Sequence, residues 1–288
     1  MTGRAIVPVD TSIDPASVPT AIFARSFSSR PVPAGTEVAL ELRGGDRLGP
    51  AGIMFDLDMD WEPEFLGAVE NGCSNQRIRG RDWFSLPGIL LGGPVGAGRT
   101  HVARRLARAA GVPHILFDAA TDMFTRHCAR PDVPLPLPIA PAIMACGCAN
   151  PVVSIVGIEA ASEDMVTIVS RLVDGATNSG FPDQALSAAI DYSAVTWIVQ
   201  ARDADEVPDR LASRLDRIDL RGGEREDRDL RIIDVLAEVL ADRAIGLPPG
   251  IDLEDLLGDA RRWVRDDPST AKLYRRVDDR VGIHAPPF

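Results

Sequence analysis

The residues with the clearest chemical potential are the eight from Gly93 to Thr100. The apolar run 89–91 precedes them, and a segment with helical spacing, 101–106, follows them. Glycines let backbone N–H groups turn toward an anion, and a helix N-terminus adds the positive end of its dipole. This strand–glycine loop–helix context distinguishes a phosphate-binding loop from a chance run of glycines. The pattern therefore predicts a nucleotide site made by the whole run: Gly93, Pro94, Val95, Gly96, Ala97, Gly98, Arg99 and Thr100.

Arg99 stands where such a loop normally carries a lysine, while Thr100 keeps the hydroxyl that would hold Mg²⁺ beside the phosphates. A guanidinium preserves the positive charge but replaces a compact, flexible ammonium with a wide planar fork, so the change is not conservative. Lys272 is the only lysine among 31 basic residues, so a compositional bias is an alternative explanation for Arg99. We expect nucleotide binding to survive and the γ-phosphate geometry to change.

Composition limits the remaining possibilities. With 45% hydrophobic residues in 288, the chain can build a large core, and its net charge of −11 argues against a general nucleic-acid binder. Cys146 and Cys148, with His127–Cys128 nearby, match no standard zinc spacing. The chain shows neither a signal-peptide pattern nor an apolar run long enough to span a bilayer. We therefore expect a cytoplasmic protein without a membrane partner.

The order of elements predicts an α/β fold. Strand-like runs alternate with helical patterns, which favours βαβ units and a parallel sheet. The expected strands are 89–92, 114–117, 152–156 and 195–199, and the expected helices are 98–110, 138–148 and 161–174. Helical patterns at 225–245, 251–264 and 268–281 follow. We predict an N-terminal appendage over residues 1–62, partly β or irregular, a three-layer αβα P-loop core over 63–221, and a helical lid over 222–288.

Over about residues 80–285 the chain resembles the AAA+ ATPases, and among them the Lon-like ATPase modules. Besides the phosphate-binding loop, three ordered blocks carry the resemblance: Asn150–Glu159, Thr196–Asp203 and Pro208–Arg214. They match the Walker B strand, the sensor-1 strand and the Pro-x-x-Leu-x-x-Arg pattern of the family. The protease domain that follows this module in Lon is not expected here. Met123–Phe124 lies where Lon-like modules carry a pore loop, but such a pair is more often core, and we assign no pore.

The departures from the family pattern fall on its catalytic positions. Val156 corresponds to the Mg²⁺-orienting aspartate and Gly157 to the water-activating glutamate. Neither residue can coordinate a metal or accept a proton through its side chain. Thr100 and the phosphates would then be the only ligands of Mg²⁺, which predicts weak metal binding. Glu159 is a candidate replacement acid, because strand alternation would bring it to the same side as Gly157.

Three further positions complete the comparison with the family. Arg202 corresponds to the sensor-1 asparagine; it can contact a γ-phosphate but cannot accept a hydrogen bond from water. Alternatively, it pairs with neighbouring acids at the surface. Arg214 corresponds to the arginine finger, which the resemblance implies acts on the nucleotide of a neighbouring subunit; the alternative is a solvated helix residue. The sensor-2 arginine falls near Ala271, with Lys272 beside it.

These features predict an AAA+ family protein that binds ATP or ADP and whose ATP hydrolysis is doubtful. Such a chain would be a pseudo-ATPase or a regulatory or structural ring subunit. We expect a homo-oligomer or hetero-oligomer, the latter with an active AAA+ paralogue, and no nucleic-acid partner. The alternative is an active ATPase that remodels proteins or delivers them to a protease. The sequence specifies no client protein.

Overall fold

The computed structural model describes residues 19–26, 37–49, 52–57, 59, 62–121, 137–183, 185–220, 228–243, 248, 250–267 and 269–282. Met123–Phe124 and His127–Cys128 lie outside these ranges. Within the described part, no helix has the length and apolar character needed to cross a bilayer.

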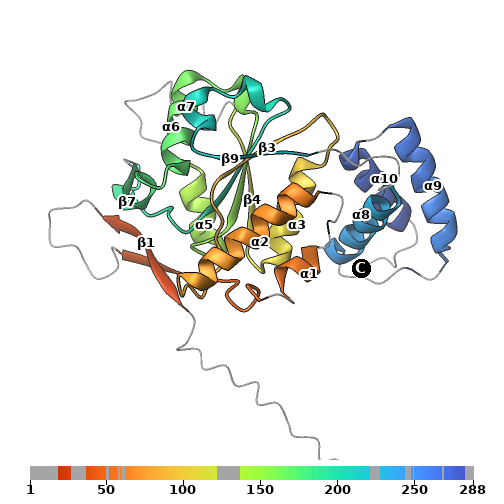
Figure 1. Ribbon diagram of the computed structural model, residues 1–288, viewed down its shortest axis with the longest axis horizontal. Helices are drawn as coiled ribbons and strands as arrows, with labels where there is room; N and C mark the ends of the chain where they lie inside the picture. Colours follow the sequence, from red (N-terminus) through yellow and green to blue (C-terminus); the bar gives the residue numbers. More distant parts are fainter. Residues whose placement is uncertain are drawn as a thin grey trace, which may run out of the picture.

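A parallel sheet forms the centre of the molecule (Figure 1). Its five strands lie in the order β4-β5-β8-β3-β9, and each neighbouring pair is parallel. Their bounds are β3 (Ile89–Gly92), β4 (His114–Asp118), β5 (Val152–Val156), β8 (Thr196–Gln200) and β9 (Asp216–Asp219). The predicted α/β fold with a parallel sheet is confirmed, and β9 is a strand that the sequence patterns did not reveal.

Side chains from both faces of this sheet are buried, which explains why its central strands are mostly apolar. Leu90, Val153 and Val199 point into one hydrophobic cluster, while Leu91, Val152 and Ile198 point into another. The first cluster is completed by α5 (Ile139–Cys146), α6 (Glu163–Val173) and α7 (Asp209–Ala212). The second is completed by α1 (Ile53–Leu57), α2 (Pro63–Ile78) and α3 (Arg99–Ala109). The result is a three-layer arrangement of helices, sheet and helices.

A second, antiparallel sheet joins the N-terminal part of the chain to the core. Its order is β2-β1-β7-β6, formed by β1 (Thr20–Ser26), β2 (Glu37–Glu41), β6 (Phe181–Asp183) and β7 (Ala188–Ile190). Phe23 on β1 packs edge-on against Tyr192, which in turn contacts Trp197 on β8. Phe23 and Ala24 of β1, with Leu40 and Leu42, thus belong to the same hydrophobic cluster as one face of the central sheet.

The C-terminal helices pack around a hydrophobic cluster of their own. They are α8 (Arg228–Asp242), α9 (Leu253–Asp266) and α10 (Thr270–Gly282), and they lie at one end of the molecule, at the right of Figure 1. Their amphipathic spacing places apolar residues such as Val235, Ala260 and Val277 in this cluster. The opposite face of α8 is acidic and meets the basic face of α3.

Candidate nucleotide site

The loop between β3 and α3 has a backbone that only glycine adopts readily. Gly93, Gly96 and Gly98 have φ values of 141°, 90° and 92°, all in the left-handed half of the map where a side chain would be strained. Gly98 is also the N-cap of α3 and offers no side chain to cap the helix. The first N–H groups of α3 therefore face the loop as donors, an arrangement suited to an anion.

The Arg99 side chain folds back onto this same loop. Its Nη1 donates to the carbonyl oxygens of Gly93 and Pro94, the second at 3.1 Å. Burial lowers the pKa of Arg99; the carboxylate of Glu159 opposes that effect, and the guanidinium of Arg202 adds to it. Arg99 thus braces the loop and shares its electrostatic surroundings with Glu159 and Arg202.

Thr100 is engaged by a residue that the sequence analysis did not single out. Its hydroxyl donates to Oε1 of Gln200 at 2.9 Å. Gln200 ends β8, where Leu91 of β3 is its partner in the ladder, and only 4% of its surface is exposed. Within the described structure its Nε2 has no hydrogen-bond partner. The signal available in the sequence was a polar side chain at the end of a strand whose three central residues are apolar.

The Walker B region differs from the family pattern in its backbone as well as its side chains. Gly157 follows β5 with a φ of 73°, and a Cβ placed there would come within 2.6 Å of Oδ1 of Asp118. Asp118 ends β4 and accepts a hydrogen bond from the N–H of Ala120 at 2.9 Å. The Asp118 carboxylate thus lies against the space where a side chain of residue 157 would begin. A glutamate there would be strained by the backbone conformation and would have to displace the Asp118 carboxylate.

Glu159 and Arg202 lie together at the carboxyl ends of β5 and β8, which are neighbours in the sheet. Glu159 lies in the 3₁₀ turn Ile158–Ala160, and its Oε1 accepts from the backbone N–H of Arg202 at 2.5 Å. The acids next to Arg202 have other partners. The Asp203 carboxylate accepts a hydrogen bond from the backbone N–H of Asp205, and the Asp205 carboxylate pairs with Arg217. The carboxyl ends of β3, β5 and β8 therefore gather Arg99, Thr100, Glu159, Gln200 and Arg202.

The donor set does not fit a resident Mg²⁺. Thr100 can offer its hydroxyl oxygen, whose hydrogen is donated to Gln200, but Val156 and Gly157 offer no side-chain oxygen beside it. The part of the chain described contains no group of three His, Cys, Asp or Glu residues arranged to hold a metal. Mg²⁺ prefers several oxygen ligands in octahedral geometry. The expectation that Thr100 holds Mg²⁺ therefore lacks a supporting ligand set in this structure.

The lid helices contact the phosphate-binding loop directly. The backbone N–H and the hydroxyl of Thr270, at the start of α10, both contact the carbonyl oxygen of Gly96, at 3.3 and 3.0 Å. Arg231 on α8 donates to the same oxygen at 3.3 Å. Ala271, the predicted sensor-2 position, directly follows Thr270, and Lys272 pairs with Asp267 instead of approaching the loop. Thr270 and Arg231 are thus the lid residues that support the loop.

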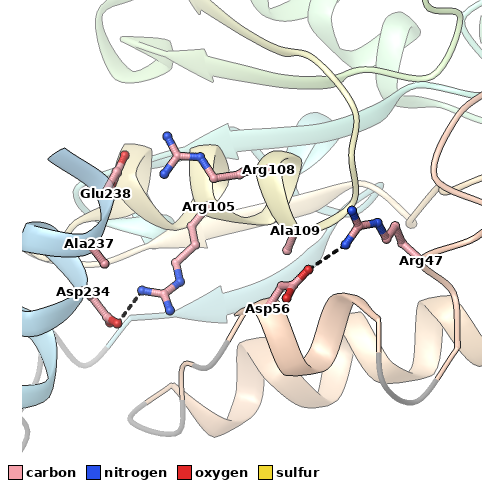
Figure 2. Close-up of a pocket in the computed structure, with 8 residues that line it drawn as sticks. All are labelled: Arg47, Asp56, Arg105, Arg108, Ala109, Asp234, Ala237 and Glu238. Atoms are coloured by element: carbon pink, nitrogen blue, oxygen red, sulfur yellow. Dashed lines mark hydrogen bonds and ion pairs between the residues drawn. The ribbon is translucent and has the colours of Figure 1, made fainter. Parts of the chain in front are cut away.

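Ion pairs fix α8 against α3, the helix that begins at the loop. Glu238, only 4% exposed, pairs with His101 and with Arg104. Arg105 pairs with Asp234 at 2.6 Å (Figure 2). A cavity of about 400 Å³ lies beside these contacts. Figure 2 shows the residues that line it, which carry charges of both signs. Acidic side chains of α8 thus meet basic side chains of α3 directly after the loop.

Arg214 does not join this cluster. Its Nε donates to Oδ2 of Asp174 at 3.0 Å and its Nη1 donates to the carbonyl oxygen of Arg210. The backbone of Arg214 lies beside Gly88, which directly precedes β3. Arg214 is therefore at the amino-terminal end of β3, whereas the loop follows its carboxyl end. Any action of Arg214 on a nucleotide would be on that of another subunit.

The strand order, the glycine loop and the helix that starts from it define an α/β protein with a P-loop type of anion site. No protein-family model matches the chain. The chain is similar to Lon protease homolog 3, mitochondrial, of Arabidopsis thaliana, with 26% identity over 218 residues, which is 70% of this chain and 23% of that protein. It is also 29% identical over 214 residues to the Lon protease of Frankia alni, covering 68% of this chain and 24% of that protein.

These matches confirm the sequence-based recognition of a Lon-like AAA+ module. The matched region spans only about a quarter of each relative's length. Among solved structures, a single-residue variant of Thermotoga maritima RuvB superposes with a TM-score of 0.46 and 16% identity, covering 82% of this chain and 67% of that one.

Proposed function

We propose that this chain is an AAA+ module that binds ATP or ADP without hydrolysing it at its own site, and that it works as a regulatory or structural ring subunit. The observation that carries the proposal is the backbone at Gly157. Gly157 supplies no carboxylate to activate water, and its positive φ and the Asp118 carboxylate beside it would strain a glutamate at that position. Loss of a general base typically lowers a rate by about 10²–10⁴-fold.

Nucleotide binding is supported by the loop itself. Three glycines with positive φ shape it, and the uncapped N-terminus of α3 supplies donors and the positive end of a dipole. Arg99 adds a positive charge, although its Nη1 is turned onto the loop carbonyls rather than outward. Binding thus depends mainly on backbone groups, which the lysine-to-arginine change leaves intact.

A role in a ring is supported by Arg214. It is held by Asp174 on the opposite edge of the sheet from the loop, with more than a third of its side chain exposed. From there it can reach only the nucleotide of another molecule, as the arginine finger of the family does. The neighbour is a second copy or an active AAA+ paralogue. Cytoplasmic location, like the identity of a client protein, stays a sequence-level prediction.

An active ATPase is the second candidate, and Glu159 is the observation that favours it. This carboxylate lies in the 3₁₀ turn after β5 and contacts the backbone of Arg202 in the same cluster as Arg99. If it replaced the missing glutamate as general base, the protein would turn over ATP slowly and drive remodelling or delivery of proteins to a protease.

Binding and turnover measured on the same protein test these two proposals. Isothermal titration with ATP and ADP should show binding, while phosphate release at saturating ATP stays at the level of the buffer. The matched variants are Glu159→Gln and, as a control, Glu70→Gln at an exposed position of α2. ATP turnover that disappears only in Glu159→Gln would replace our proposal with the active ATPase. An absence of binding would refute both.

A further inference from the structure

Gln200 lies between the phosphate-binding loop and the Walker B strand. In the sheet, β8 separates β3 from β5, and Gln200 is the last residue of β8. Leu91 of β3 is its register partner, and the N–H of Ala201 bonds to the carbonyl oxygen of Leu91 at 3.1 Å. In P-loop proteins Mg²⁺ binds between the loop Ser or Thr hydroxyl, the Walker B aspartate and the phosphates. The Gln200 amide therefore enters the region that such a metal would use.

The two ends of this amide match the two partners of that metal. Oε1 accepts a hydrogen bond at 2.9 Å from the Thr100 hydroxyl, the group whose oxygen would bind Mg²⁺ in the family pattern. Nε2 is buried and, within the described structure, lacks a hydrogen-bond partner. A buried donor without an acceptor carries a desolvation cost and calls for an explanation. A phosphate oxygen in the loop is an acceptor of the required kind.

The charge that Mg²⁺ would supply has another source here. Beyond the effect of burial, Arg202 lies close enough to Arg99 to lower its pKa, and Glu159 is the nearby acid that partly balances the two cations. Val156, in place of the aspartate, leaves no second protein ligand for a metal. Two guanidinium groups and a neutral amide thus lie at the loop where the family uses a lysine, an acid and a cation.

We propose that the Gln200 carboxamide takes the place of Mg²⁺ at this site, bridging the Thr100 hydroxyl and a nucleotide phosphate, so that the protein binds nucleotide without a divalent cation. This inference rests on the proposed function, since it requires that nucleotide bind in the loop. It adds the metal independence of that binding and assigns it to one side chain.

The full-length protein is titrated with ATP and with ADP, once in excess EDTA and once in excess MgCl₂. For the wild type we expect dissociation constants that differ by less than about threefold between the two conditions, since a Mg²⁺-dependent site would lose at least one strong charge-assisted contact, worth about tenfold or more. Binding that requires Mg²⁺ would overturn this inference and leave nucleotide binding itself intact. A protein that binds neither nucleotide under either condition would refute the proposed function, and this inference with it.

Two variants assign the effect to the amide. Gln200→Leu removes the donor at similar volume and should weaken binding in EDTA by about 10- to 100-fold, the loss of a hydrogen bond to a charged group. Gln200→Glu replaces the donor with a carboxylate that repels phosphate but can hold a cation, so its binding should fail in EDTA and return with MgCl₂. Gln76→Leu on α2 is the matched control, because Gln76 is also 4% exposed and its amide donates to Trp83 away from the site.

Thermal melting of each variant separates loss of binding from loss of folding. If Gln200→Leu and Gln76→Leu are equally folded and bind nucleotide in EDTA as well as the wild type does, the assignment to Gln200 is wrong. The wild-type comparison between EDTA and MgCl₂ keeps the metal-independence test decisive even if a Gln200 variant does not fold.

Discussion

Replacing Gly157 with alanine is the most direct test of why the family's general base is missing. The φ of 73° lies in the left-handed region, where a non-glycine residue costs roughly 1–2 kcal/mol. The new Cβ would also approach Asp118 Oδ1 at 2.6 Å and Ala120 Cβ at 3.0 Å. Moving the Asp118 carboxylate aside breaks its hydrogen bond with Ala120, which adds about 1 kcal/mol. We expect Gly157→Ala to lower the free energy of unfolding by about 2–3 kcal/mol in total.

Equilibrium unfolding in urea measures this change, and the chain offers a matched control. Gly147 has a similar φ of 64°, but a Cβ placed there meets no atom within 4 Å. Gly147→Ala should therefore show only the backbone part of the cost, and the excess in Gly157→Ala should fall when Asp118→Ala is added. Equal destabilisation by the two glycine variants would refute the crowding that we infer from Asp118.

The same geometry predicts that restoring the family residues will not restore hydrolysis. The triple change Arg99→Lys, Val156→Asp and Gly157→Glu supplies the lysine and both acids. Glutamate at 157 must still adopt a positive φ beside Asp118. We expect ATP turnover to remain at background, and a clear rise in phosphate release from the folded triple variant would show that the backbone is not the obstacle.

Further predictions concern the lid, the sheet and assembly. Burial alone would raise the pKa of Glu238, but His101 and neighbouring arginines lower it overall; Glu238→Gln should therefore cost about 1.5–3 kcal/mol at neutral pH in urea unfolding, and the difference from wild type should shrink as pH falls through the folded pKa, below the usual glutamate range. Burial lowers the pKa of His114 to about 4, so the folded state binds fewer protons than the unfolded state between roughly pH 6.5 and 4. The free energy of unfolding should therefore decrease as the pH is lowered from about 6.5 to about 4. This decrease should be smaller in His114→Gln. Arg214→Ala and Asp174→Ala should each leave the nucleotide dissociation constant unchanged, whereas only Arg214→Ala should reduce ATP turnover in mixed rings with an active paralogue; identical effects of the two variants there would reduce Arg214 to a surface ion pair.

Local chemistry in the sequence was enough to predict the main architecture. A mostly apolar run such as 152–156 avoids water only when both faces of the strand are buried. Such runs are typical of a central strand in a parallel sheet. The glycines of the loop were informative because three of them adopt backbone conformations that other residues avoid. The relation to Lon-like modules also followed from short blocks in a fixed order. The arginine in the loop and the missing Walker B acids were visible as residue types.

Only the tertiary structure revealed what these replacements do, because the effects depend on contacts between distant segments. Gln200 meets Thr100 across 100 positions, since β8 and α3 converge beside β3. Asp118 lies against Gly157 because β4 and β5 are paired in register, with Asp118 opposite Val156. The sequence by itself indicated a loop of the P-loop type and showed that Val156 and Gly157 replace the two Walker B acids. Which side chains fill the space beside that loop was decided by packing, since register and strand order set those neighbours.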